Sequence, residues 1–277
     1  MEALLAYIPT DRLDALAEGV TLPDHVNGAA LFADISGFTP LTEALARELG
    51  PQRGAEELTR HLNTVYDALI EELHRYGGSV IGFSGDAITC WFEGDTGIYA
   101  AACALRMQQA MDRFVNVATP SGQSLSLAMK AAVATGSARR FLVGDPDIQV
   151  MDVLAGSILD RLAAAEHQAD KGQVVLDPTT EAALGSAIRI EGWHEDEETG
   201  QRFGIVMGLT NDVRPLPWAP VHPNALTEEQ IRPWLLPSVF ERLRSGQGEF
   251  LAELRPAVAL FLRFSGIDFD NELDFGK

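Results

Sequence analysis

The sequence has few cysteines, no membrane-length apolar run and a shortage of basic residues. Its two cysteines, Cys90 and Cys103, are not spaced like metal ligands. This excludes a disulfide framework and indicates buried thiols in a reducing compartment. No apolar run is long enough to span a bilayer, and Met1–Tyr7 carries an acid and no basic residue, unlike a secretory signal. These absences predict a cytoplasmic protein without a membrane partner.

Basic residues are the scarcer charged class. The 277 residues include 21 Lys plus Arg against 40 Asp plus Glu, a formal net charge of -19. Such a field repels nucleic acid and anionic lipid, so neither is expected as a partner. It also repels a nucleotide, unless metal ions or a local basic site offset the charge. The hydrophobic content of 46% and the charged content of 22% are ordinary for a soluble globular protein.

One segment occurs twice, and its second copy has an inverted charge. Leu31–Thr39 reads LFADISGFT and Leu260–Ile267 reads LFLRFSGI, so the same apolar run precedes the same Ser-Gly turn. Asp34 in the first copy corresponds to Arg263 in the second. The pattern predicts two homologous domains with divided tasks, one of which holds a cation.

The chain is therefore interpreted as one whole domain followed by the start of another. The predicted divisions are a lead-in at 1–27, the complete domain at 28–210, a Pro-rich connector with short helices at 211–255, and the first strand of a truncated second domain at 256–277.

Apolar spacing within residues 28–210 predicts strands and helices in an irregular alternation. The order is typical of an α+β sandwich with helices on one face of a mixed sheet, and not of repeated βαβ units. The predicted strands are 29–33, 79–83, 87–92, 125–134, 139–143, 149–154, 172–176, 187–193 and 203–209, and the main predicted helices are 53–76, 96–114 and 157–167.

Two carboxylates stand at the ends of predicted strands. Asp34 follows the first strand and Asp86 lies in the hairpin turn, so both reach one sheet edge if the strand lies beside the hairpin. Two carboxylates there suit hard divalent cations. The stretch Ser36–Thr39 leads into a helix N-terminus, which suits a triphosphate. Either acid alone is more simply a turn residue; together with the Arg263 exchange, they favour a site.

These segments resemble a known family. Phe32–Thr39 and Gly78–Ala87 are similar to the two metal motifs of class III nucleotidyl cyclases, with the closest similarity to the first half of soluble-type tandem adenylyl cyclases. The resemblance covers about residues 28–210. It implies a ferredoxin-like βαββαβ core in a mixed, mainly antiparallel sheet, which works only as a dimer of halves. It also implies that ATP is converted to cyclic AMP and pyrophosphate in intracellular signalling.

The resemblance also assigns roles to residues of the two motifs. Two Mg²⁺ or Mn²⁺ ions are expected on the side chains of Asp34 and Asp86 and on the main-chain carbonyl of Ile35. The phosphates are expected at the turn and helix start that follow. The residues concerned are Ser36, Gly37, Phe38 and Thr39 for phosphate, with Ser84 and Gly85 forming the hairpin turn before Asp86.

The base-reading positions depart from the family pattern. Gly82 stands where the family has a base-reading Lys, Val153 where it has Asp or Thr, and Ser157 where it has Asn. Arg161 is the one candidate for the transition-state Arg. The expected partner is therefore a second domain that supplies base recognition, either from the same full-length chain or from a homodimer. The choice between ATP and GTP stays open.

Two other functions compete with a catalytic half. A degenerate cyclase domain that binds nucleotide and regulates without turnover is favoured by Gly82, Val153 and Ser157. A cyclic dinucleotide synthase needs a Gly-Gly-Asp/Glu-Glu-Phe turn, whereas the hairpin here reads Ser84-Gly85-Asp86-Ala87.

Overall fold

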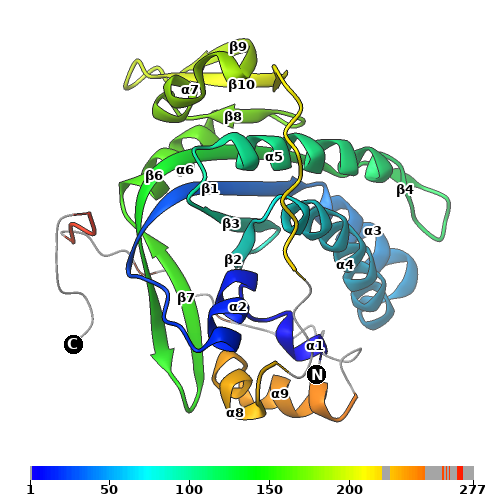
Figure 1. Ribbon diagram of the computed structural model, residues 1–277. Coiled ribbons are helices and arrows are strands. Elements are labelled where there is room, and N and C mark those ends of the chain that lie inside the picture. The colour runs from blue at the N-terminus through cyan, green and yellow to red at the C-terminus, as the bar shows by residue number, and fades with distance from the viewer. Residues whose placement is uncertain are drawn as a thin grey trace.

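The computed structural model describes residues 2–219, 225–246, 258, 260, 262 and 267–270. Figure 1 shows a twisted sheet with helices packed against it and a smaller group of helices below. The elements in chain order are α1 (Glu2–Leu5), α2 (Thr10–Glu18), β1 (His25–Ser36), α3 (Phe38–Leu49), α4 (Pro51–Arg75), β2 (Ser79–Ser84), β3 (Ala87–Glu93), α5 (Ile98–Met111), η1 (Asp112–Phe114), β4 (Val117–Ala118), β5 (Ser124–Leu125), β6 (Ala128–Asp145), β7 (Gln149–Ala155), α6 (Ser157–His167), β8 (Val174–Leu176), α7 (Pro178–Leu184), η2 (Gly185–Ala187), β9 (Ile188–Glu195), β10 (Arg202–Leu209), α8 (Glu228–Ile231), η3 (Arg232–Trp234) and α9 (Pro237–Arg244).

The main sheet has the predicted mixed, mainly antiparallel arrangement. Its strand order is β2-β3-β1-β6-β8-β10-β9, with β7 paired to β6. β1 is antiparallel to both β3 and β6, and only the β6–β8 pairing is parallel. β1, α3 with α4, β2, β3, α5 and β6 follow one another as a βαββαβ unit, so the predicted core is confirmed.

Helices cover both faces of the sheet, and the prediction of helices on one face is wrong. Alternate β1 residues, such as Leu31 and Ile35, are buried in the core shared with α3, α4 and α5. Ala30 lies in a second core, where Ile158 and Leu162 of α6 pack near Trp91. Because β1 is apolar on both faces, each face needs a cover.

β6 is one continuous strand, although two strands were predicted over 125–134 and 139–143. Gly136 and Ser137 interrupt the apolar pattern but stay in register with Gly28 and Asn27 of β1. Backbone pairing with β1 therefore keeps β6 continuous at Gly136 and Ser137. Beyond β1, the strand continues as a long hairpin with β7 (Figure 1).

The lead-in and the described part of the connector form a satellite core of their own. α1 and α2 pack with α8, η3 and α9, to the right of the lower half of the β6–β7 hairpin in Figure 1. Leu13, Trp234 and Phe240 are among its buried residues, and Val150 of β7 joins them. The segment at 225–246 is thus packed against the lead-in.

The predicted second-domain strand at 256–277, including Arg263, lies largely outside the described residues. Val258, Leu260 and Leu262 are described as exposed, and the turn Ile267–Asp270 lies near the β6–β7 hairpin. The domain boundaries therefore stay predictions.

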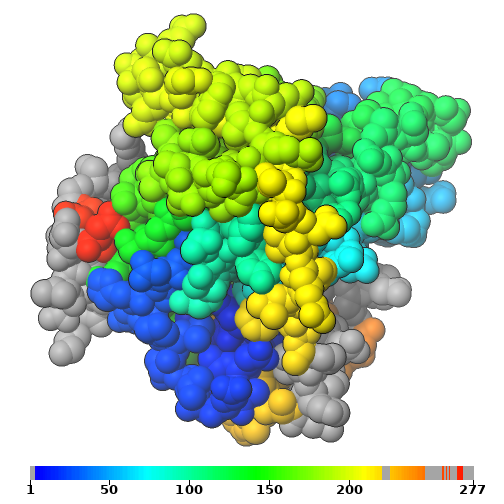
Figure 2. All heavy atoms as spheres, turned by 45° about the horizontal axis from the view of Figure 1, so that its top comes forward, coloured from blue at the N-terminus to red at the C-terminus, as the bar shows by residue number. Residues whose placement is uncertain are grey.

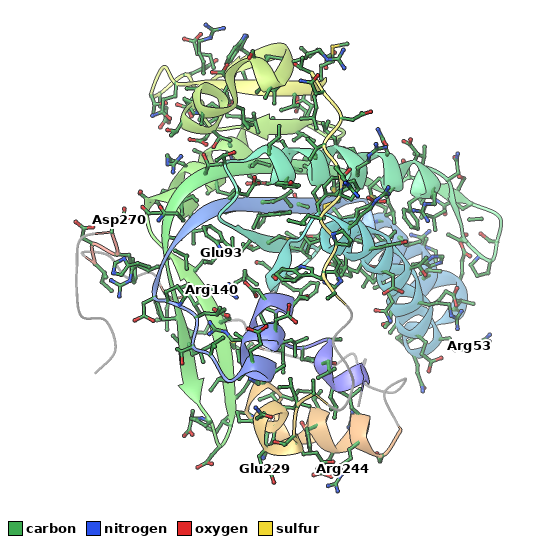
Figure 3. All side chains as sticks on the ribbon, in the orientation of Figure 1. Arg53, Glu93, Arg140, Glu229, Arg244 and Asp270 are labelled. Carbon is green, nitrogen blue, oxygen red and sulfur yellow. The ribbon has the colours of Figure 1, made fainter. Side chains whose placement is uncertain are left out.

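Four charged residues join α2 to the β6–β7 hairpin. Arg140 Nη2 lies 2.8 Å from Asp152 Oδ2 and donates to Asp11 Oδ1 at 2.9 Å. Arg12 Nε donates to Asp152 Oδ2 at 3.0 Å. Arg140 is buried, and Figure 3 shows it between α2 and the hairpin. Buried charges require such pairing because water no longer solvates them.

Replacing Arg140 is expected to destabilise the protein strongly. Arg140→Met leaves two carboxylates with one guanidinium, so we expect the free energy of unfolding in urea to fall by about 3 kcal/mol or more. Arg53→Met, an exposed change on α4, is the control. Equal urea midpoints for the two variants would contradict this account.

His74 makes the attachment of α2 sensitive to acid. Its Nε2 lies 3.0 Å from Thr10 Oγ1, and burial lowers the pKa of His74 below its ordinary value. The unfolded chain therefore takes up this proton at higher pH than the folded chain, and stability falls as pH drops below about 6.5. His74→Gln should make the free energy of unfolding less dependent on pH between about 7.5 and 5. The exposed change His167→Gln should leave that slope unaltered.

Candidate metal and phosphate site

The two predicted metal carboxylates come to one edge of the sheet. Asp34 lies near the end of β1, opposite Ala87 in the register with β3. Asp86 lies in the turn between β2 and β3, and its carbonyl oxygen accepts a hydrogen bond from Ile35 N–H at 3.2 Å. β1 and the hairpin turn are thus joined where both acids stand.

The site carries unbalanced negative charge. Burial raises the pKa of Asp34, the neighbouring Asp86 raises it further, and Lys130 lowers it. Asp34 is therefore harder to ionise, and a divalent cation would offset this cost. Within the described residues, no group of three or more His, Cys, Asp or Glu side chains gathers as a metal site. Two carboxylates with the Ile35 carbonyl nevertheless form an all-oxygen donor set that fits Mg²⁺ or Mn²⁺.

Lys130 is a site residue that the sequence reasoning missed. It lies directly across from Asp34 in the β1–β6 register, with Nζ 3.9 Å from Asp34 Oδ2. The same Nζ is 2.7 Å from Glu166 Oε1 on α6. The sequence did contain a sign of this role, because Lys130 is the single lysine of an apolar strand and the whole chain has three lysines. Lys130 thus places a basic group beside Asp34 in this acidic chain.

Tyr66 on α4 supports the hairpin turn that carries Asp86. Its hydroxyl donates to Gly85 O at 3.4 Å, and its ring meets Phe83 edge-on at 5.3 Å between centroids. Burial raises the pKa of Tyr66, and Asp86 and Asp34 raise it further, so the hydroxyl lies in the field of both acids. The sequence did not reveal this role, because an aromatic residue at this position of the helix is equally compatible with packing in the core.

The predicted phosphate-binding stretch forms a tight turn into α3. Gly37 has φ +105°, and a Cβ there would lie 2.4 Å from Ser126 O, so only glycine fits. Ser36 Oγ donates to Ala128 O at 3.3 Å, Phe38 is buried and Thr39 is exposed. Among the described residues, no side chain caps α3. Its first-turn amides therefore have no side-chain acceptor from the N-cap, which leaves them available to an anion.

Comparison with known proteins identifies the fold. No family model matches the chain. Human adenylate cyclase type 10 is 22% identical over 276 residues, which cover 91% of this chain and 17% of that protein. The guanylyl cyclase Cya2 has a TM-score of 0.55 at 24% identity, covering 67% of this chain and 94% of Cya2. The adenylyl cyclase CyaB from P. aeruginosa has a TM-score of 0.52 at 21% identity, covering 69% and 97%. The fold is that of the class III nucleotidyl cyclases.

The chain corresponds to a small part of its curated relatives, spanning 17% of the human protein. The resemblance to class III cyclase catalytic domains is confirmed. Across the residues that the structure describes, helices with the length and apolarity needed to cross a membrane are absent.

Two of the predicted base-reading positions, Val153 and Ser157, lie away from the two carboxylates. Val153 pairs with Phe141 on β6, whereas Asp34 pairs with Lys130 on the same strand. Eleven residues separate those two β6 positions, roughly 35 Å along an extended strand. Ser157 begins α6, beyond β7. The structure therefore does not bring these positions together with the carboxylates.

Gly82 lies on β2, four residues before Asp86. Among the described atoms, none lies within 4 Å of a Cβ built at Gly82. Packing in this domain therefore does not require glycine, and a side chain such as Lys has room.

Arg161, the predicted transition-state residue, is bound within the domain. Its Nη1 donates to Asp177 Oδ2 at 2.6 Å and its Nη2 to Thr135 O at 2.7 Å. Asp177 also accepts from the amides of Thr179 and Thr180 at the start of α7. In this conformation the guanidinium joins α6, β6 and α7.

Lys130 should affect metal and nucleotide binding in opposite directions. Lys130→Met removes a cation beside Asp34, so we expect Mn²⁺ alone to bind roughly 2- to 5-fold more tightly. A triphosphate with Mn²⁺ should bind more weakly, because an ammonium donor is lost. Calorimetric titration measures both, with the exposed Lys171→Met as the control. Parallel changes in the two affinities would exclude this role.

Proposed function

We propose that this domain is the metal-binding half of a nucleotidyl cyclase. Together with a second cyclase domain, it converts ATP to cyclic AMP and pyrophosphate in intracellular signalling in the cytoplasm. The human relative is an adenylate cyclase, which favours ATP, whereas Cya2 is a guanylyl cyclase, so GTP is the second candidate substrate.

One observation carries the proposal. Asp34 and Asp86 meet beside the first turn of α3, while Val153 is roughly 35 Å along β6 from this edge. One domain cannot place Val153 and the two carboxylates around a single nucleotide. A second domain is therefore required to complete the site, which agrees with the repeat at Leu260–Ile267.

The reaction needs phosphate charge to be neutralised. The ribose 3′-oxygen loses its proton and bonds to the α-phosphorus, while the bond to the pyrophosphate oxygen breaks. Asp34, Asp86 and the Ile35 carbonyl would hold two Mg²⁺ or Mn²⁺ ions, which would neutralise the triphosphate and lower the pKa of the 3′-hydroxyl.

Other residues of this chain position the phosphate groups and the turn that holds Asp86. The α3 amides behind Ser36 and Gly37 bind phosphate oxygens, because a helix N-terminus attracts anions. Lys130, released from Asp34 when a cation binds there, can donate to a phosphate oxygen. Tyr66 keeps the hairpin turn, and hence Asp86, in place.

A regulatory domain that binds nucleotide without turnover is the second candidate. It is favoured by Gly82, Val153 and Ser157, and by the ion pair that engages Arg161 with Asp177. The two candidates share the metal site and differ in turnover.

Turnover is expected only when the second domain is present. We expect residues 1–277 alone to produce little cyclic AMP or cyclic GMP with Mn²⁺. A pair of two such chains would have the metal carboxylates at both of its sites and base-reading residues at neither. A longer chain that continues through the second repeat should be active and should reveal the preferred base. Robust turnover by residues 1–277 would refute the need for a second domain. Silence of both chains with Mn²⁺-dependent nucleotide binding intact would favour the regulatory candidate.

Either metal carboxylate should be indispensable in the longer chain. Loss of a residue that only supports a metal ligand typically lowers activity roughly 10- to 100-fold. Asp34→Asn and Asp86→Asn change the proposed ligands themselves, so each should lower cyclic nucleotide production by more than this. Asp67→Asn, an equal charge change on the exposed side of α4, is the control. Unchanged production in either site variant would sink the metal assignment.

A further inference from the structure

The C-terminal end of α6 lies beside the candidate metal site. Ala30 of β1 faces this helix, since it shares a core with Ile158 and Leu162. Asp34 is four residues beyond Ala30 on the same strand, so its side chain lies on the same face of the sheet. Glu166 belongs to the last turn of α6. The helix therefore brings one more carboxylate to the face that carries Asp34.

Glu166 binds the ammonium group of Lys130 through two oxygens. Lys130 Nζ lies 2.7 Å from Glu166 Oε1 and donates to the main-chain oxygen of Glu166 at 3.5 Å. The same Nζ is 3.9 Å from Asp34 Oδ2, which is beyond hydrogen-bonding distance. The end of a helix also attracts a cation, because its last carbonyl groups point outward there. Lys130 is thus bound to α6 and only near Asp34.

The ammonium group keeps one donor for a further acceptor. It has three N–H groups, and the two oxygens of Glu166 engage two of them. The Lys130 side chain is 24% exposed, so the third N–H is open to water or to a phosphate oxygen. Lys130 can therefore bind a phosphate without leaving Glu166.

Glu166 matters most when a divalent cation occupies Asp34. Such a cation would repel the ammonium of Lys130. In the absence of Glu166, the ammonium either stays with Asp34 and opposes the cation, or spreads over many rotamers in solvent. Glu166 offers a fixed anionic partner that is not one of the proposed metal ligands.

We infer that Glu166 is a positioning residue for Lys130, which it holds off Asp34 and beside the edge where phosphate is proposed to bind. The inference rests on the proposed metal and phosphate site, and it adds the residue that decides which acid Lys130 binds. Glu166 also raises the pKa of Asp34, so its charge acts on the metal position directly as well. A test must therefore separate the direct effect of this charge from the effect that passes through Lys130.

A double-mutant cycle on Mn²⁺ affinity separates the two effects in residues 1–277. Glu166→Gln removes the charge and keeps the main-chain oxygen, so Lys130 moves onto Asp34 and Mn²⁺ should bind roughly 2- to 5-fold more weakly. In a chain that also carries Lys130→Met, no ammonium is left to move, so the effect of Glu166→Gln should be smaller by roughly 2-fold or more. Asp212→Asn is an equal charge change in the exposed connector, which Figure 2 shows in yellow across the surface, and should leave the affinity unaltered. Calorimetric titration measures each affinity.

The outcomes of the cycle distinguish this inference from the proposed metal site. Equal effects of Glu166→Gln with and without Lys130 would overturn the inference alone, because Glu166 would then act only through its own charge. A wild-type chain that binds no Mn²⁺ would overturn the metal site and the inference with it.

The ammonium of Lys130 can also be followed directly, because the chain has three lysines. With ¹⁵N at lysine Nζ and saturating Mg²⁺, NMR should show slow hydrogen exchange at Lys130 in the wild type. In Glu166→Gln the exchange should be as fast as at the exposed Lys171. Fast exchange at Lys130 in the Mg²⁺-bound wild type would show that Glu166 does not hold the ammonium.

Discussion

The pairing of β1 with β3 on one side and β6 on the other is the constraint on which the site depends. Register with β3 brings Asp34 beside the turn that holds Asp86, and register with β6 places Lys130 across from it. A shift of one residue would turn every β1 side chain to the opposite face. The apolar residues on both faces of β1 oppose such a shift, so core packing also fixes the position of the carboxylates.

The fold brings the charged residues of the candidate site close together. The chain has a net charge of -19, and backbone pairing brings the acidic residues Asp34 and Asp86 close together. Lys130 offsets part of their mutual repulsion, and Glu166 binds Lys130 in turn. The proposed cations would offset the rest.

The lead-in and the connector belong to the same body as the sheet. Arg140 and Asp152 on the β6–β7 hairpin bind the start of α2, and the satellite core joins α2 to α9. The hairpin is therefore held by this cluster, and Phe141 on the same hairpin stacks with Phe269.

The sequence by itself determined most of the strands, the long helices and the two carboxylates proposed as metal ligands, because local apolar spacing and turn residues encode them. The family resemblance extended this to the fold, which the sheet order confirms. Lys130, Glu166 and Tyr66 could not be assigned, since each gains its role from strand register or helix packing between distant segments. The continuity of β6 and the cover on the second face were likewise missed, because backbone pairing and burial on both sides are settled between strands. Only the tertiary structure decided that Arg161 binds Asp177 and that Asp270 caps α6, as these contacts join segments whose spacing along the chain carries no signal.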